Sequence, residues 1–145
     1  MNFVYADEAR KLLHVIYVGT LDTAAAHALL EATRGALRSL TPGFDVLSDL
    51  RELKAVDKEA IAEVDELMDL INAHGVGKVI RILPAATEDF GFAIMSLFHY
   101  GHAVRIVTCL HLEEAVARLA TPAQRSGHTP GDNLPPVDGQ SQPNR

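Results

Sequence analysis

The sequence has a single cysteine, Cys109, among its 145 residues. A lone thiol excludes an intrachain disulfide and any CxxC pair. Basic residues are also scarce, with 13 Lys and Arg against 19 Asp and Glu and a formal net charge of −6. Nucleic acids and anionic membrane surfaces both select clustered basic side chains, so this charge balance argues against either as a partner.

Long apolar runs are missing as well. No stretch approaches the ~18 consecutive apolar residues that a membrane-spanning helix needs. Residues 1–8 lack the basic region and apolar core of a signal peptide. Together with the lone cysteine, these absences predict a cytoplasmic protein. The length is sufficient for one domain with a buried core.

Residues 121–145 differ in composition from the rest of the chain. This segment holds five of the seven prolines, no aromatic residue, and only Ala123, Leu134 and Val137 as apolar side chains. Such a segment buries too little surface to offset its ordering entropy. We therefore predict a domain over residues 1–120 and a disordered Pro/Gly-rich tail over residues 121–145.

Strand and helix patterns alternate through the first 120 residues. Runs rich in β-branched and aromatic residues predict strands, and apolar residues at helical spacing predict helices. The predicted strands cover 3–5, 12–18, 44–50, 79–83 and 104–109, and the predicted helices cover about 22–40, 57–74, 88–100 and 112–120. This order predicts an α/β fold in which a mixed, mostly parallel five-stranded sheet carries about four helices and opens with an N-terminal antiparallel hairpin.

Three short motifs appear in a characteristic order on this pattern. They are Gly19-Thr20-Leu21-Asp22, Asp49-Leu50 and Leu112-Glu113-Glu114-Ala115. In sequence and spacing they resemble the STAS domain, the fold of bacterial anti-sigma-factor antagonists, over roughly residues 3–120. The resemblance implies a non-catalytic regulatory protein that docks on a protein partner, either kinase-like or another regulator, with a homodimer as a further possibility.

The chain departs from the family at the position of its switch. In the family, the first serine after a loop aspartate is phosphorylated by a partner kinase, and the phosphate blocks docking on that kinase. This chain reads Asp57-Lys58-Glu59-Ala60 there. Because neither Lys58 nor Glu59 carries a hydroxyl, we expect no conventional phosphoserine switch. Asp57 and Glu59 also suit an ordinary helix start, as a cap and a first-turn carboxylate, whereas Glu59 would alternatively mimic a permanently modified state.

The same resemblance indicates a partner-binding surface. We assign it to Asp22, Asp49, Asp57, Lys58 and Glu59, which come from the first helix start, the third strand and a loop over residues 51–59. The three aspartates are expected to meet at one sheet edge, where open α/β folds bind ligands. The alternative is that they are two helix caps and one loop acid.

The predicted third helix suggests a second function. Its sequence, FGFAIMSLFHYG, puts apolar residues on more than one face. The residues concerned are Phe90, Phe92, Met95 and Phe98. They would form either a deeply packed helix or an apolar patch for a partner, a dimer or a lipid-like ligand. The chain would then be a carrier or sensor of a small apolar molecule.

An enzymatic function is the third hypothesis. Cys109 and His111 lie two apart, so they share a face if the strand continues. No clear orienting partner accompanies them, and a structural buried cysteine is the favoured interpretation. His99, His102 and His111 lack a carboxylate or cysteine at ligand spacing, and Gly75-Val76-Gly77 follows a helix, unlike a phosphate loop. We therefore expect no metal, no cofactor and no catalytic residue.

Overall fold

The computed structural model describes residues 1–84, 96–98, 100 and 104–119. The predicted third helix over 88–100 falls largely outside these residues, as does the predicted tail over 121–145. Both therefore stay predictions.

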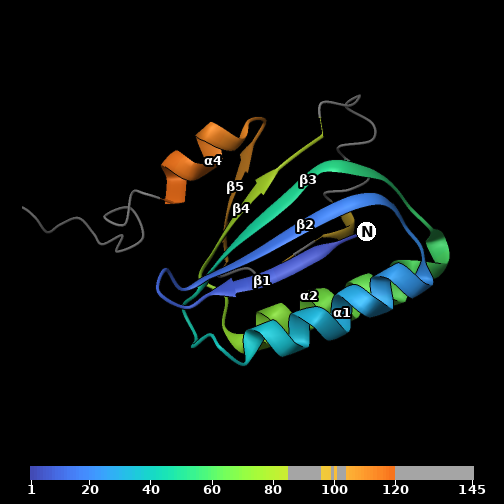
Figure 1. The fold of residues 1–145 in the computed structure, drawn as a ribbon, viewed down its shortest axis with the longest axis horizontal. Coiled ribbons are helices and arrows are strands. Elements are labelled where there is room, and N and C mark those ends of the chain that lie inside the picture. The colour runs from blue at the N-terminus through green and yellow to red at the C-terminus, as the bar shows by residue number, and fades with distance from the viewer. Residues whose placement is uncertain (85–95, 99, 101–103, 120–145) are drawn as a thin grey trace, which may run out of the picture.

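The architecture is a five-stranded sheet whose spatial order follows the chain, β1-β2-β3-β4-β5 (Figure 1). The strands are β1 (Phe3–Asp7), β2 (Leu12–Leu21), β3 (Asp45–Val56), β4 (Lys78–Ile82) and β5 (Arg105–Cys109). The first pair is antiparallel, and the three following pairs are parallel. This confirms the predicted fold class, including the opening hairpin.

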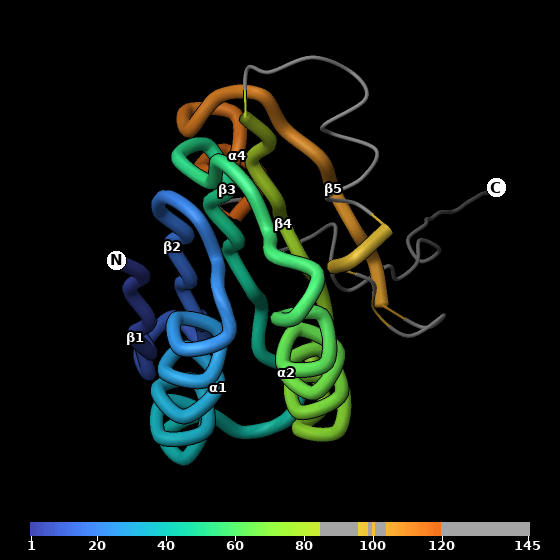
Figure 2. The backbone as a smooth tube through the Cα atoms, turned by 90° about the vertical axis from the view of Figure 1, so that its right-hand side faces the viewer, coloured from blue at the N-terminus to red at the C-terminus, as the bar shows by residue number. Residues whose placement is uncertain are grey.

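Two long helices cover one face of the sheet, and a short helix lies on the other (Figures 1 and 2). They are α1 (Thr23–Leu37), α2 (Ile61–His74) and α4 (Leu112–Leu119), and a 3₁₀ turn, η1 (Lys58–Ala60), precedes α2. Crossovers of the same hand that advance the same way across a sheet place their helices on one face, which explains α1 and α2. The described residues thus hold three α-helices, against about four predicted for the whole domain.

Strand alternation divides the buried residues between two clusters. On β2, Leu13, Val15 and Tyr17 face α1 and α2 and belong to the larger core. Leu12 points to the other face and packs in a smaller cluster with Ile80, and this cluster also contains Ala115 of α4. Successive side chains of a strand point to opposite faces of the sheet. This alternation also decides on which face each polar side chain of the central strands lies.

The third strand is longer than predicted. It runs to Val56, where the sequence analysis ended it at Leu50 and placed a loop over residues 51–59. β2 also continues past Gly19 to Leu21, through a register irregularity at which Gly19 adopts φ +80°. The charged residues between 51 and 56 have weak strand propensity, but β2 offers them a hydrogen-bonding partner. Tertiary pairing therefore decides the strand's length.

A glycine joins the end of α2 to the loop before β3. Gly75 has φ +96° and ends the helix in the left-handed conformation. A Cβ at this position would lie 2.9 Å from the Cβ of Pro42. The carbonyl of Gly75 accepts a 2.7 Å hydrogen bond from the amide of Gly43. The close approach of the two segments therefore requires glycine here.

Candidate functional site

Two of the predicted partner-binding residues lie together where β2 and β3 end. Asp22 follows β2, and Asp57 follows β3 at the adjacent position. The amide of Asp57 donates a 3.0 Å hydrogen bond to the carbonyl of Leu21, which fixes the two chain segments to each other. The carboxyl ends of neighbouring parallel strands form the edge where open α/β folds place their ligands.

Lys58 and Glu59 extend this exposed edge. Asp22, Asp57, Lys58 and Glu59 are all exposed, whereas the following Ala60 is fully buried. We refer to these four exposed residues as the docking edge. Ala60 anchors the turn in the core, so the charged side chains before it are held at the surface.

The interpretation of Asp57 as a side-chain cap is wrong. Its side chain makes no capping hydrogen bond to η1, and Ala60 occupies the N-cap of α2. Asp22, in contrast, caps α1: its Oδ1 accepts a 2.8 Å hydrogen bond from the amide of Ala25. The difference arises because the 3₁₀ turn separates Asp57 from the first turn of α2. The two aspartates therefore have different structural roles.

Asp49 does not join the docking edge. It lies within β3, where it is opposite Ile16 of β2 and Ile82 of β4. The β3 residue at the docking edge is Val56, and at about 3.3 Å per residue Asp49 lies roughly 20 Å back along the strand. The expectation that three carboxylates meet at one sheet edge is therefore wrong for Asp49. Strand extension to Val56 separates it from the others.

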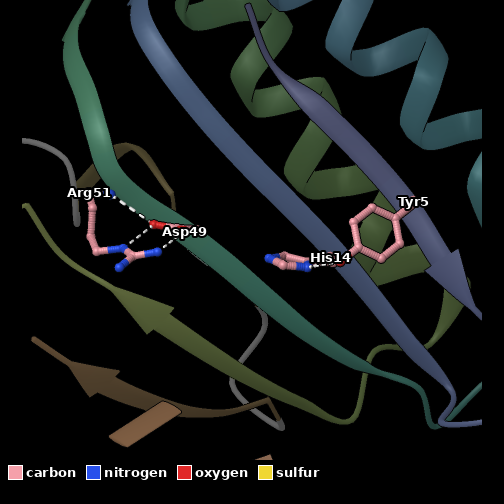
Figure 3. A network of polar contacts seen from close by, with 4 residues as sticks. All are labelled: Tyr5, His14, Asp49 and Arg51. Carbon is pink, nitrogen blue, oxygen red and sulfur yellow. Dashed lines mark hydrogen bonds and ion pairs between the residues drawn. The ribbon is translucent and has the colours of Figure 1, made fainter. Parts of the chain in front are cut away.

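Asp49 has a basic partner that the sequence analysis missed (Figure 3). Arg51 Nε donates to Oδ1 of Asp49 at 2.9 Å, and Nη2 donates to Oδ2 at 2.7 Å. The Arg51 amide adds a 3.1 Å bond to Oδ1. Burial alone would raise the pKa of Asp49, but these bonds and the charge of Arg51 outweigh it and hold the pKa below its ordinary value. The D-x-R spacing on a strand was the available signal, because residues two apart share a face.

His14 points from β2 toward Asp49 on the same face of the sheet (Figure 3). Its Nδ1 lies 2.6 Å from the hydroxyl of Tyr5, and its Nε2 is buried without a hydrogen-bond partner among the described residues. Burial lowers the pKa of His14, while Asp49 acts in the opposite direction and Arg51 adds to the lowering. The sequence analysis missed His14 because it sits inside an apolar strand.

These side chains belong to a part of the sheet that α4 leaves uncovered. α4 lies over β4 and β5, whereas α1 and α2 cover the opposite face (Figure 2). Phe3 and Tyr5 of β1 are 48% and 51% exposed, and they are opposite Ile16 and His14. We refer to this region as the open sheet face. Its residues are Phe3, Tyr5, His14, Ile16, Asp49 and Arg51.

Solved structures with the same fold include an anti-sigma factor antagonist. SpoIIAA in its unphosphorylated form has a TM-score of 0.53 and 17% identity, covering 82% of this chain and 97% of its own. The phosphorylated form of Bacillus SpoIIAA has a TM-score of 0.52 and 16% identity, with 82% and 99% covered. This chain has a STAS-like fold.

A protein of the DUF3478 family from Shewanella loihica PV-4 has the same STAS-like architecture. This uncharacterised protein, described as having a SpoIIAA-like fold, gives a TM-score of 0.62 and 16% identity, with 82% of this chain and 94% of its own covered. No family model matches the sequence, and no curated protein matches it. The resemblance that the motifs predicted is therefore confirmed at the level of the fold.

Of the four residues predicted to form an apolar patch on the third helix, only Phe98 is among the described residues. Phe98 is buried, and its ring packs edge-on against Tyr17 with centroids 5.0 Å apart. Phe90, Phe92 and Met95 lie outside the described residues, so their assignment to an apolar ligand or partner patch stays a prediction. Phe98 contributes to the core beneath the STAS-like sheet and not to the surface.

Cys109 has the character of a structural residue. It is 1% exposed at the end of β5, whereas His111 is exposed. Burial raises the pKa of the Cys109 thiol, and the charge of Glu114 raises it further. A nucleophilic cysteine requires a lowered pKa, so this environment does not favour the alternative of an enzyme using Cys109 and His111.

Within residues 1–84, 96–98, 100 and 104–119, no group of three or more His, Cys, Asp or Glu side chains is arranged to hold a metal ion. Over the same residues, no helix has the length and apolar character needed to cross a membrane.

Proposed function

We propose that this chain is a non-catalytic regulatory protein of bacterial type that acts in the cytoplasm by docking on a protein partner. The docking edge would contact the partner, which is kinase-like or another regulator. The observation that carries the proposal is the exposure of Asp22, Asp57, Lys58 and Glu59 side by side at the ends of two bonded parallel strands. SpoIIAA, which has the same fold, is an anti-sigma factor antagonist, and this supports a regulatory role for the present chain.

Regulation of this docking would not use a phosphoserine at the edge. The positions after Asp57 are Lys58 and Glu59, and neither side chain has a hydroxyl to accept a phosphoryl group. The carboxylate of Glu59 is a permanent part of the side chain, whereas the charge of a phosphorylated serine is removable. We propose constitutive docking, controlled by the amount of protein or partner.

Asp49 remains a predicted contact residue, but on a separate surface. Its carboxylate lies on the open sheet face and already accepts three hydrogen bonds from Arg51. A partner would therefore meet an Arg51–Asp49 pair there and not an isolated acid. We assign the primary contact to the docking edge, where the four exposed side chains are contiguous.

A charge swap tests the docking edge. The double variant Lys58→Glu/Glu59→Lys keeps the net charge but reverses the local pattern, and it should abolish capture of the partner because rim charges steer association and register. The matched control is Glu8→Lys/Arg10→Glu in the β1–β2 turn, at the opposite end of β2. Proteins captured by wild type and control from a bacterial lysate would be compared by quantitative mass spectrometry.

The outcomes of this comparison are distinct. Loss of a specific protein in the edge variant, with retention in the turn variant, supports docking through the edge. Recovery of the same proteins at the same level by all three forms would exclude the edge as the contact surface. Circular dichroism of each variant checks that the fold is intact.

A further inference from the structure

A buried arginine lies beneath the sheet, away from the docking edge. Arg81 of β4 is 4% exposed and faces the α1 and α2 side, since its neighbours Ile80 and Ile82 face α4. Its Nη2 donates a 3.2 Å hydrogen bond to the carbonyl of Phe98. Among the described residues, no carboxylate lies within ion-pair distance of its guanidinium. A buried guanidinium without a counter-charge is costly and calls for an anion.

Hydroxyl groups from three segments converge near this arginine. Ser48 of β3 is directly opposite Arg81 of β4, and Tyr17 of β2 projects to the same face. Tyr100 contributes the third hydroxyl: burial raises the pKa of Tyr100, as it does that of Tyr17, while Ser48 and Arg81 both lower the two pKa values. Figure 1 shows β2, β3 and β4 as consecutive neighbours, which explains how residues far apart in sequence meet.

Two of these hydroxyls lack a hydrogen bond of regular geometry. The Tyr17 hydroxyl and the Ser48 Oγ are buried and form no such bond within the described part of the chain. Ser48 still lies close enough to the hydroxyls of Tyr17 and Tyr100 to lower the pKa of both. Both residues are more than nine-tenths buried. Burial raises the pKa of Tyr17, so its hydroxyl stays protonated and is available as a donor. Buried polar groups are normally hydrogen-bonded. Three loosely bonded hydroxyls beside a guanidinium that has no carboxylate partner among the described residues therefore suit a bound acceptor.

We propose that Arg81, Tyr17 and Ser48 bind the carboxylate of a small-molecule ligand beneath the sheet. The planar guanidinium matches a carboxylate in a two-pronged geometry. One buried positive charge balances one negative charge, so a monoanionic carboxylate fits, whereas a phosphate dianion would leave a second charge buried and unpaired. The rings of Tyr17 and Phe98 supply apolar surface next to the carboxylate, which suits a ligand with a hydrocarbon body.

Three probes separate the carboxylate from the apolar body. Decanoate has both features, acetate has the carboxylate alone, and decanol has the chain alone. Binding to the full-length protein is measured by isothermal titration calorimetry, with thermal unfolding as a second readout. Decanoate should bind and raise the unfolding temperature by mass action, and decanol should not. Acetate binding as tight as decanoate binding would also support the site and would assign a short ligand.

Substitutions test whether Arg81 and Tyr17 bind the carboxylate of decanoate. Arg81→Met should weaken decanoate binding by at least about tenfold, because it removes a charge-assisted pair. Tyr17→Phe keeps the ring and should weaken binding by about fivefold, as expected for one hydrogen bond. The control Arg10→Met, at an exposed turn position, should bind as wild type does. If Arg81→Met fails to fold, Tyr17→Phe still decides the result.

The proposal fails under any of three results. Absence of binding by both carboxylates, equal binding of decanol and decanoate, or unchanged decanoate binding by Arg81→Met and Tyr17→Phe would each overturn it. None of these results concerns the docking edge, which lies at the strand ends. The two proposals are therefore tested separately.

Discussion

Single residues on the open sheet face have properties that their neighbours impose. Asp49 would be a costly buried acid if it were alone. Arg51 prevents this, because its Nε and Nη2 each donate a hydrogen bond to one of the two carboxylate oxygens. Such a pair stabilises mainly by avoiding an unpaired buried charge. His14 has the opposite situation, since its Nε2 has no partner in the described structure and burial disfavours its charged form.

The lowered pKa of His14 predicts a pH dependence of stability. The unfolded chain binds a proton on this histidine near pH 6.5, whereas the folded protein does so only at lower pH. Between the two pKa values the unfolded state binds more protons, so the free energy of unfolding falls as the pH drops below about 6.5 and levels off below the folded pKa. Urea denaturation of wild type and His14→Gln between about pH 7.5 and 5 measures this slope.

The variant should have a flatter profile than wild type over that range. His111→Gln is the matched control, because His111 is exposed at the start of the α4 segment. It should retain the slope of wild type. A wild-type slope that survives unchanged in His14→Gln would assign the pH dependence to another group.

At the scale of elements, the two helices on one face begin differently. α1 starts with a side-chain cap, whereas α2 starts through a 3₁₀ turn in which Asp57 makes only backbone bonds. The Asp57 amide bonds to Leu21 and its carbonyl accepts from the amide of Ala60. The sequence located the start of α1 correctly, but it began the second helix at about residue 57, whereas α2 begins at Ile61 after the 3₁₀ turn. It could not distinguish the caps, since Asp22 and Asp57 have the same chemistry before the fold places them.

A pair of aspartate substitutions tests this difference. Asp22→Ala should lower the free energy of unfolding by about 1 kcal/mol, because it removes the acceptor for the Ala25 amide. Asp57→Ala should change it by less than about 0.5 kcal/mol, as for an exposed site without a side-chain bond. Chemical denaturation of both variants under identical conditions gives the comparison. Equal losses in the two variants would contradict the assigned roles.

At the scale of the whole molecule, the helices of the described residues cover the two faces of the sheet unequally. α1 and α2 cover one face, and α4 covers only the β4 and β5 side of the other (Figure 2). The main core therefore lies between β2, β3, β4 and the two long helices, and the smaller cluster lies under α4. The domain boundary predicted after residue 120 follows the end of α4 at Leu119.

That boundary predicts the effect of a truncation. Removing residues 121–145 should leave the free energy of unfolding in urea unchanged to within about 0.5 kcal/mol, with the same m-value, because the deleted segment has few apolar side chains to bury. The measurement compares the full chain with a chain ending at residue 120. A clear loss of stability on truncation would show that the tail contributes to the domain.

The sequence by itself determined the order of the described elements, the hairpin, the mostly parallel sheet and the STAS-like fold, because hydrophobic periodicity and short motifs are local signals. It placed Asp22 at the start of α1, where the structure has it, and it placed Asp57, Lys58 and Glu59 at a helix start, where the structure has a 3₁₀ turn before α2. Only the tertiary structure decided that β3 extends to Val56 and separates Asp49 from that edge. It alone brought Arg81, Ser48 and Tyr17 together, because contacts across strands depend on register, which no single segment encodes.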